Sequence, residues 1–217
     1  MYLYLDSTQH IVCGIYDDNT KSWVSYKELH NKKGSKLMHG LTFELLSEQN
    51  LKIDDIEGLI LASGPGSYTG MRLAEGFAQI LEWRNVPVRS FYHFEVPGFH
   101  GVKEGLWVAS AFKGEYFYYQ WPRQEGDPPL SENLMSREAF HTWMKQAREK
   151  FGANAKEQIF CHLKNIFEQE DFIPDSTFEL IRTRAGEFFT HILQRGKRLE
   201  PFYYRPLEKE FTIPKGL

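Results

Sequence analysis

The segment that most restricts the fold is an apolar run followed by a glycine-rich loop and a long helical pattern. Residues 59–62 (Leu-Ile-Leu-Ala) carry no polar side chain, which is typical of a strand covered on both faces. Residues 63–67 then include two glycines and a proline, and residues 69–83 have the periodicity of a helix. A buried strand that leads through a tight loop into a helix indicates an α/β protein.

The remaining elements predict two related halves. In the first half we expect three β-like runs, a helix and two more strands with a helix between them: 2–5, 11–16, 23–26, 35–49, 59–62, 69–83 and 86–92. The second half starts in a similar way but is shorter, with predicted elements at 106–112, 115–121, 136–151, 159–161 and 185–195. Gly196 ends the last of these helices. We place the boundary near Gly98, with domains at 1–98 and 99–217, the second reduced and its last segment free to return to the first.

Composition narrows the classes of function. The 217 residues carry 26 basic and 29 acidic side chains, a net charge of −3, whereas proteins that bind nucleic-acid phosphates usually have a basic excess. A small basic cluster at 194–198 with Arg205 is more typical of a helix end in solvent. The two cysteines provide neither a disulfide framework nor a four-ligand zinc site. The start of the chain does not resemble a signal peptide and no apolar run is long enough for a membrane span, so we expect a cytoplasmic protein without membrane contact.

The glycine loop is the first candidate site. Free backbone N–H groups and the helix dipole meet where a buried strand turns into a helix, and phosphate is often held there. The glycines at 64, 66 and 70 match neither the dinucleotide fingerprint nor the P-loop, and Pro65 removes a donor. On spacing alone a tight structural turn is therefore favoured over phosphate binding. The residues of a vestigial nucleotide site would be Asp6, Ser7, Thr8, Gly64, Gly66, Ser67 and Thr69.

The helix at 69–83 is the second candidate site. Its polar residues form one narrow stripe, which consists of Arg72, Glu75, Gln79 and Glu82. The apolar arc is wider than the roughly 100° that a helix needs to cover a single sheet, so two faces should be buried. Gly70, Ala74 and Ala78 recur every four residues and form a ridge of small side chains that a second helix could approach closely. Either the helix at 35–49 or another protein could cover that ridge.

These motifs resemble the TsaB (YeaZ) family. Residues 64–72 (Gly-Pro-Gly-Ser-Tyr-Thr-Gly-Met-Arg) are similar to its signature, and residues 5–8 and 52–56 resemble its N-terminal loop and the segment before its buried strand. Residues 111–115 and 200–205 resemble the family more weakly, so the resemblance is good to about residue 98 and thin beyond.

The resemblance implies an actin- and Hsp70-like (ASKHA) fold of two related domains. It also implies a non-catalytic subunit that binds the catalytic subunit TsaD and, with the ATPase TsaE, supports synthesis of N6-threonylcarbamoyladenosine at position 37 of tRNA. ATP and metal would be held by the partner subunits, tRNA would be contacted only indirectly, and a homodimer could form without the partner. The expected interface lies on the two helices of the first domain, at Leu37, Met38, Leu41, Leu45, Gly70, Met71, Ala74, Phe77, Ala78 and Leu81.

The sequence departs from the family pattern at a few positions. Gly34-Ser35-Lys36 stands where many members have His-Ser-Glu, and Ser110 and Phe112 replace an Asp and an Arg in the second half. These departures leave the role of the second half open.

Enzyme alternatives are poorly supported. An actin-like kinase needs two phosphate loops with an acidic residue each, and the turn at 110–114 has no carboxylate. A peptidase would need paired histidines four residues apart or a Gly-x-Ser-x-Gly elbow, and neither occurs. A homodimeric scaffold that uses the same two helices is the remaining alternative.

Overall fold

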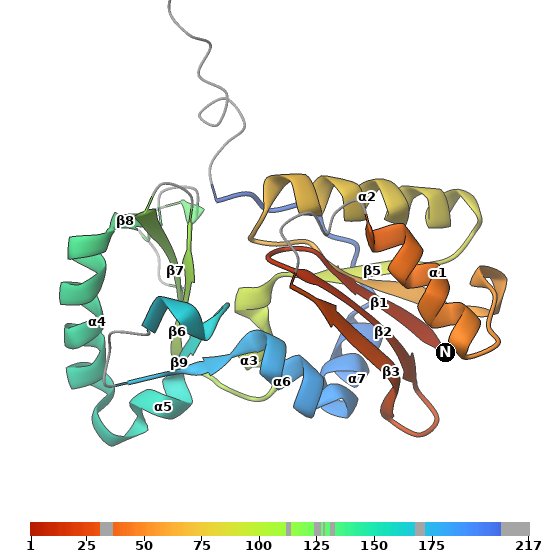
Figure 1. The fold of residues 1–217 in the computed structure, drawn as a ribbon. Coiled ribbons are helices and arrows are strands. Elements are labelled where there is room, and N and C mark those ends of the chain that lie inside the picture. Colours follow the sequence, from red (N-terminus) through yellow and green to blue (C-terminus); the bar gives the residue numbers. More distant parts are fainter. Residues whose placement is uncertain are drawn as a thin grey trace, which may run out of the picture. The chain divides into compact units, whose positions relative to one another are not determined.

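The first half of the chain forms a five-stranded mixed sheet in the order β3-β2-β1-β4-β5 (Figure 1). The computed structural model describes residues 1–30, 37–111, 114–123, 127, 129–130, 133–167 and 172–204. The strands are β1 (Tyr2–Asp6), β2 (Ile11–Asp17), β3 (Ser22–Leu29), β4 (Gly58–Ala62) and β5 (Val88–Phe91). β1 pairs antiparallel with β2, with Leu3 opposite Ile15, and parallel with β4, with Leu3 opposite Leu59.

Helices cover both faces of this sheet. Since successive side chains of a strand point to opposite faces, Leu3 and Leu5 pack on one side and Tyr4 on the other. The leucine side is covered by α1 (Met38–Glu48) and α2 (Tyr68–Trp83), whose buried residues join the same apolar cluster. The tyrosine side is covered by α7 (Ala185–Arg195), whose Phe188 and Phe189 contact Tyr4. Figure 1 shows α1 and α2 on the opposite side of the sheet from α7.

The second half forms another five-stranded sheet, in the order β10-β9-β6-β7-β8. Its strands are β6 (Gly105–Ser110), β7 (Glu115–Trp121), β8 (Leu134–Ser136), β9 (Ile159–Cys161) and β10 (Asp175–Ser176). The main helix is α4 (Arg137–Phe151), whose Phe140, Met144 and Ala147 pack on the sheet. Shorter helices are α3 (Val96–Phe99), α5 (Ala155–Gln158) and α6 (Thr177–Thr183).

The two sheets have the same topology. In each, three antiparallel strands (β3-β2-β1 and β8-β7-β6) are followed by two parallel neighbours (β4-β5 and β9-β10). The predicted α/β actin-like fold with two related halves is therefore confirmed. The chain divides into one unit of Met1–Glu95 with Thr183–Phe202 and a second of Val96–Arg182 with residues 203 and 204. The last helix thus belongs to the first unit, a return that the sequence left open.

Most predicted elements lie within a few residues of the observed ones. The helix expected at 35–49 is observed from Met38, and Ser35 and Lys36 lie outside the described residues. The strand expected at 106–112 ends at Ser110, and Phe112 also lies outside the description. β8, β10 and α6 were not predicted, because two to seven residues are too few to show a period. Within the described ranges, no helix has the length and apolar character needed to cross a bilayer.

Candidate functional site

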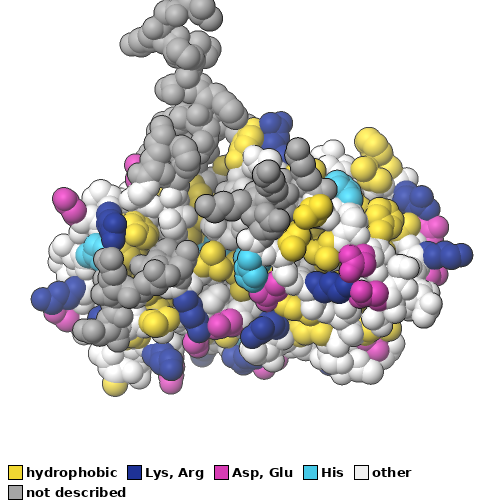
Figure 2. Space-filling view, in the orientation of Figure 1, with side chains coloured by type: hydrophobic (Ala, Val, Ile, Leu, Met, Phe, Trp, Pro, Cys, Tyr) yellow, Lys and Arg dark blue, Asp and Glu magenta, His cyan; other side chains and the backbone are white. Residues whose placement is uncertain are grey.

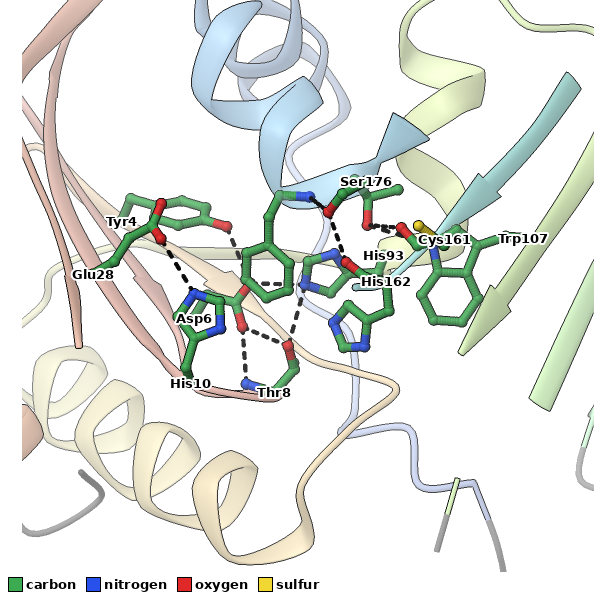
Figure 3. Close-up of polar contacts among 12 residues, drawn as sticks. Tyr4, Asp6, Thr8, His10, Glu28, His93, Trp107, Cys161, His162 and Ser176 are labelled. Atoms are coloured by element: carbon green, nitrogen blue, oxygen red, sulfur yellow. Dashed lines mark hydrogen bonds and ion pairs between the residues drawn. The ribbon is translucent and has the colours of Figure 1, made fainter. Parts of the chain in front are cut away.

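The end of β1 carries a fully buried polar cluster of Asp6, Thr8 and His93 (Figure 3). Asp6 Oδ2 lies 2.7 Å from His93 Nε2, and Asp6 Oδ1 accepts hydrogen bonds from the backbone N–H and the hydroxyl of Thr8. The hydroxyl of Tyr4 also donates to Asp6, at 3.2 Å. His93 follows β5 and is held in place because its backbone N–H donates to the carbonyl of Gly64. The cluster therefore joins the ends of β1 and β5 to the glycine loop.

The electrostatics of this cluster favour an ionised carboxylate. Burial alone would raise the pKa of Asp6, but the charge and hydrogen bond of His93 and the two hydrogen bonds from Thr8 outweigh it. The pKa of Asp6 is consequently well below its usual range. Thr8 and Asp6 both approach the same ring nitrogen of His93, whereas a catalytic triad uses opposite nitrogens for the hydroxyl and the carboxylate. The cluster is thus arranged as a structural network rather than a nucleophile and its base.

The glycines of the loop are required by close backbone packing. A methyl group on Gly66 would overlap the backbone of Thr8, and one on Gly70 would overlap the carbonyl oxygen of Ser7. Gly64 has a φ of +112° and lies against the carbonyl of Phe202. The spacing of the three glycines is therefore explained by the way the loop and the start of α2 fit against the β1–β2 turn.

Two backbone donors of the glycine loop, the N–H groups of Ser63 and Ser67, are engaged within the chain. The N–H of Ser67 donates to the carbonyl of Thr8 at 2.5 Å, and the Ser67 hydroxyl accepts from the N–H of Gly70 as the N-cap of α2. Ser7 is buried, whereas Thr69 is exposed at the start of the helix. This geometry favours the structural turn over a phosphate cradle, and the nucleotide site remains a prediction.

The small-residue ridge of α2 does not face outward as expected. Ala74 and Ala78 are 0% exposed and pack against the sheet, and Gly70 packs on Ser7. The helix turns its smallest side chains toward the strands because they allow the closest approach to the sheet. Most of the other predicted interface residues are also buried within the first unit: Met38, Leu45, Met71, Phe77 and Leu81. Leu41 is partly buried against the same core, and Leu37 is exposed.

A different side of α2 leaves apolar surface open. A groove of about 540 Å³ runs between α1 and α2, lined by His39, Tyr68, Thr69, Arg72, Leu73, Gly76, Phe77 and Ile80. Four large apolar side chains of this region are exposed: Leu37 at 48%, Phe43 at 55%, Ile80 at 47% and Trp83 at 81%. Figure 2 shows hydrophobic side chains gathered over α1 and α2. The wide apolar arc of α2 is therefore real, but its second face is the side toward α1.

Three of these surface residues, Phe43, Ile80 and Trp83, were not predicted from the sequence. Their apolar character was visible, but the pattern alone did not show which apolar side of each helix meets the sheet. The polar stripe on α2 could have indicated which apolar side of the helix is open. Glu75 and Glu82 bind Arg198, at 2.5 and 2.9 Å, so this side of α2 is covered by the segment after α7. The open apolar side is the one away from that ion pair.

The corresponding strand ends of the second unit hold a different network (Figure 3). The hydroxyl of Ser176 donates to the carbonyl of His162 at 2.7 Å, and Trp107 Nε1 donates to the hydroxyl of Thr177 at 3.4 Å. The His162 ring stacks on Phe178, with centroids 5.1 Å apart. Burial raises the pKa of the Cys161 thiol, which keeps it protonated. These contacts connect β10 and the start of α6 to β6 and to the end of β9.

Comparison with known proteins identifies the fold. A crystal structure titled as an uncharacterized protein with similarity to peptidase YEAZ from Pseudomonas aeruginosa superposes with a TM-score of 0.59 and 17% identity, covering 94% of this chain and 99% of that one. The chain has a YeaZ-like fold. The structure titled YeaZ from Pseudomonas aeruginosa matches at a TM-score of 0.47 and 17% identity, over 62% of this chain and 65% of that one, which is just under two thirds of its length.

A family model also matches the first half. Residues 27–101 match the model described as TsaD, tRNA N6-adenosine threonylcarbamoyltransferase. These residues include α1, the glycine loop and α2 of the YeaZ-like fold, and thus both candidate sites apart from Asp6, Ser7 and Thr8.

Proposed function

We propose that this chain is a non-catalytic subunit of a tRNA threonylcarbamoyladenosine synthesis complex that binds a TsaD-type catalytic subunit. The observation that carries the proposal is the open apolar groove between α1 and α2, together with the exposed Ile80 and Trp83 beside it. The YeaZ-like fold and the match of residues 27–101 to the TsaD family support it. TsaE, ATP and the metal belong to the partner side of this proposal, and tRNA is contacted indirectly.

The groove has the chemistry of a protein-docking surface. Large apolar side chains that gather on one face are costly to leave in water, and such patches usually mark interaction sites. Leu73, Gly76, Phe77 and Ile80 give the groove an apolar floor, and Arg72 provides a charge at its rim. An apolar segment of the partner that enters the groove would bury Ile80 and Trp83. A stable interface of about 1,600 Å² would extend over both helices.

The positions of the polar groups support the proposed non-catalytic role. Asp6, Thr8 and His93 are fully buried and bonded to one another, so they are poorly placed to contact a substrate. At the equivalent strand end of the second unit stands the exposed Ser110, which cannot act as the second carboxylate of an actin-like kinase. We therefore expect negligible ATP hydrolysis by the isolated chain.

Gly76→Arg tests the docking surface directly. A Cβ added at Gly76 has no heavy atom within 4 Å outside the neighbouring turns of its own helix. Arginine is also a better helix former than glycine, so the variant should fold with unchanged or slightly higher stability. The charge would lie in the groove and would have to be desolvated on docking. We expect loss of co-elution with TsaD in size-exclusion chromatography. The matched control is Gly98→Arg, an open helical glycine in α3, which should still co-elute.

The outcomes separate the alternatives. A folded Gly76→Arg protein that still forms the complex contradicts docking in this groove. Loss of a self-associated dimer, with no binding of TsaD by the wild-type chain, would instead support the homodimeric scaffold. Ala74→Arg is unsuitable as a test because Ala74 is fully buried against the sheet and its replacement would unfold the first unit.

A further inference from the structure

A second cluster of titratable side chains lies where β2 begins and β3 ends. It consists of His10, Glu28 and His30 (Figure 3 shows the first two). Ile11 pairs with Leu29 in the antiparallel register, so one position further His10 falls opposite His30. Glu28 and His30 are two residues apart on β3 and its continuation, and therefore point to the same face of the sheet. The register thus brings all three side chains together on one face.

Two distances within this cluster are close to those of a tetrahedral metal site. Glu28 Oε2 lies 3.6 Å from His10 Nε2 and 3.2 Å from His30 Nε2. A zinc ion with ligands at about 2.0–2.1 Å holds neighbouring ligand atoms about 3.3–3.4 Å apart in a tetrahedron. All three potential ligand atoms lie within 4.8 Å of one another.

The two imidazoles already turn the same ring atom toward the same oxygen. Their ring centroids are 4.3 Å apart with planes at 30°, and Nε2 of each ring is the atom nearest the Glu28 carboxylate. A shared ion pair with Glu28 is the simplest alternative. Metal titration separates coordination from this ion pair, because only coordination binds an added ion.

We propose that His10, Glu28 and His30 bind one divalent transition-metal ion of the zinc class. Two imidazole nitrogens and one carboxylate oxygen are a ligand set that suits Zn²⁺ and its first-row neighbours, whereas Mg²⁺ and Ca²⁺ prefer oxygen ligands throughout. The site has access to solvent, since the side chain of His30 is 68% exposed and that of Glu28 27%. The fourth coordination position is then left to water or to another protein.

The position of the site indicates what it does. β3 is the edge strand of the first sheet, and the metal would tie its end to β2. A metal that binds only the folded chain stabilises it. The proposal is independent of docking at α1 and α2, because none of the three ligands lines the groove. Metal binding and complex formation are also measured in separate experiments.

Metal titration of the tag-free protein tests this site. Isothermal titration with Zn²⁺ should show one equivalent bound, and Co²⁺ in its place should give the visible absorption of a tetrahedral site. His30→Ala, which removes an exposed ligand and should fold normally, is expected to lower the affinity at least about tenfold. Glu28→Gln should do the same. The control is His141→Ala on α4, which should leave binding unchanged.

Thermal unfolding gives a second measurement. With Zn²⁺ at a hundred times its Kd, the Tm of the wild-type chain should rise by about 5–10 °C, and the rise should disappear in Glu28→Gln. The proposal is overturned if the wild-type protein binds no Zn²⁺, or if both ligand variants bind as tightly as the wild type. Cys13 does not compete as a ligand, because it is buried and burial raises the pKa of its thiol to about 11.

Discussion

The two units of this protein have sheets of the same topology but differ in what connects their parallel strands. In the first unit, β4 leads through the glycine loop into the 16-residue α2 before β5. In the second, the described residues between β9 and β10 contain only the short 3₁₀ helix Lys164–Phe167. The strand ends differ too, since β1 ends in the buried Asp6 and β6 in the exposed Ser110.

The sheets form a framework that both units have, whereas the exposed apolar surface is concentrated in the first unit. Equivalent strand order in both units means that the sheet itself does not distinguish them. Among the described residues, four of the six exposed large hydrophobic side chains lie on or beside α1 and α2, and only Ile173 belongs to the second unit. The apolar surface that a partner could cover therefore depends on the connection that the second unit has reduced.

Replacing the carboxylate at the end of β1 should have the largest effect. Asp6→Ala leaves His93 and the N–H of Thr8 buried without their acceptor, and removing one partner of a buried pair costs about 3–5 kcal/mol. Ser110→Ala, at the equivalent strand end, should change the free energy of unfolding by less than about 0.5 kcal/mol. Urea unfolding of both variants measures the contrast, and similar losses would mean that the two strand ends are equivalent.

A substitution in the glycine loop should have the next largest effect on the free energy of unfolding. Gly66→Ala forces a methyl group into the backbone of Thr8 and should cost about 1–3 kcal/mol. Gly76→Ala, in the open groove of the same region, should instead stabilise the chain by up to about 1 kcal/mol, because alanine is the better helix former. Thermal unfolding compares the two. A neutral Gly66→Ala would show that the loop can move away from the β1–β2 turn.

The ion pairs of the two units should differ in strength. Arg198 is half-buried and binds both Glu75 and Glu82 on α2, so Arg198→Ala should lower the free energy of unfolding by about 1–2 kcal/mol. Lys164 binds Glu179 in the second unit with both side chains more exposed, and Lys164→Ala should cost well under about 1 kcal/mol. The denaturant midpoints of the two variants measure this difference in stability loss. Equal losses would contradict a special role for the segment after α7.

Acid should weaken the first unit through Asp6. The pKa of Asp6 is lower in the folded chain than its unfolded value of about 3.9, so the carboxylate stabilises the fold above that pH and loses this contribution as the pH falls. Between about pH 4 and about pH 3 the wild type should lose about 1 kcal/mol more than Asp6→Asn. Unfolding at both pH values measures the difference, and parallel losses would show that Asp6 is not held ionised.

Local pattern was enough to predict the elements and the duplication. The strand at Gly58–Ala62 and the helix at Tyr68–Trp83 were expected almost to the residue, because an uninterrupted apolar run and a helical period are properties of neighbouring residues. The short strands β8 and β10 of the second unit were missed because they are too short to show a period. The helix pair was also identified correctly as a place of excess apolar surface, but the residues named as its outer face were mostly those that face the sheet.

The sequence by itself determined the order of strands and helices, the repeat of the sheet and the width of the apolar arc on α2. Only the tertiary structure decided which part of that arc is buried, because a helix with apolar residues on two sides can turn either one to the sheet. It also decided the polar clusters. Asp6 and His93 are 87 positions apart, and His10 meets Glu28 and His30 only through strand register, so no local spacing could have paired them.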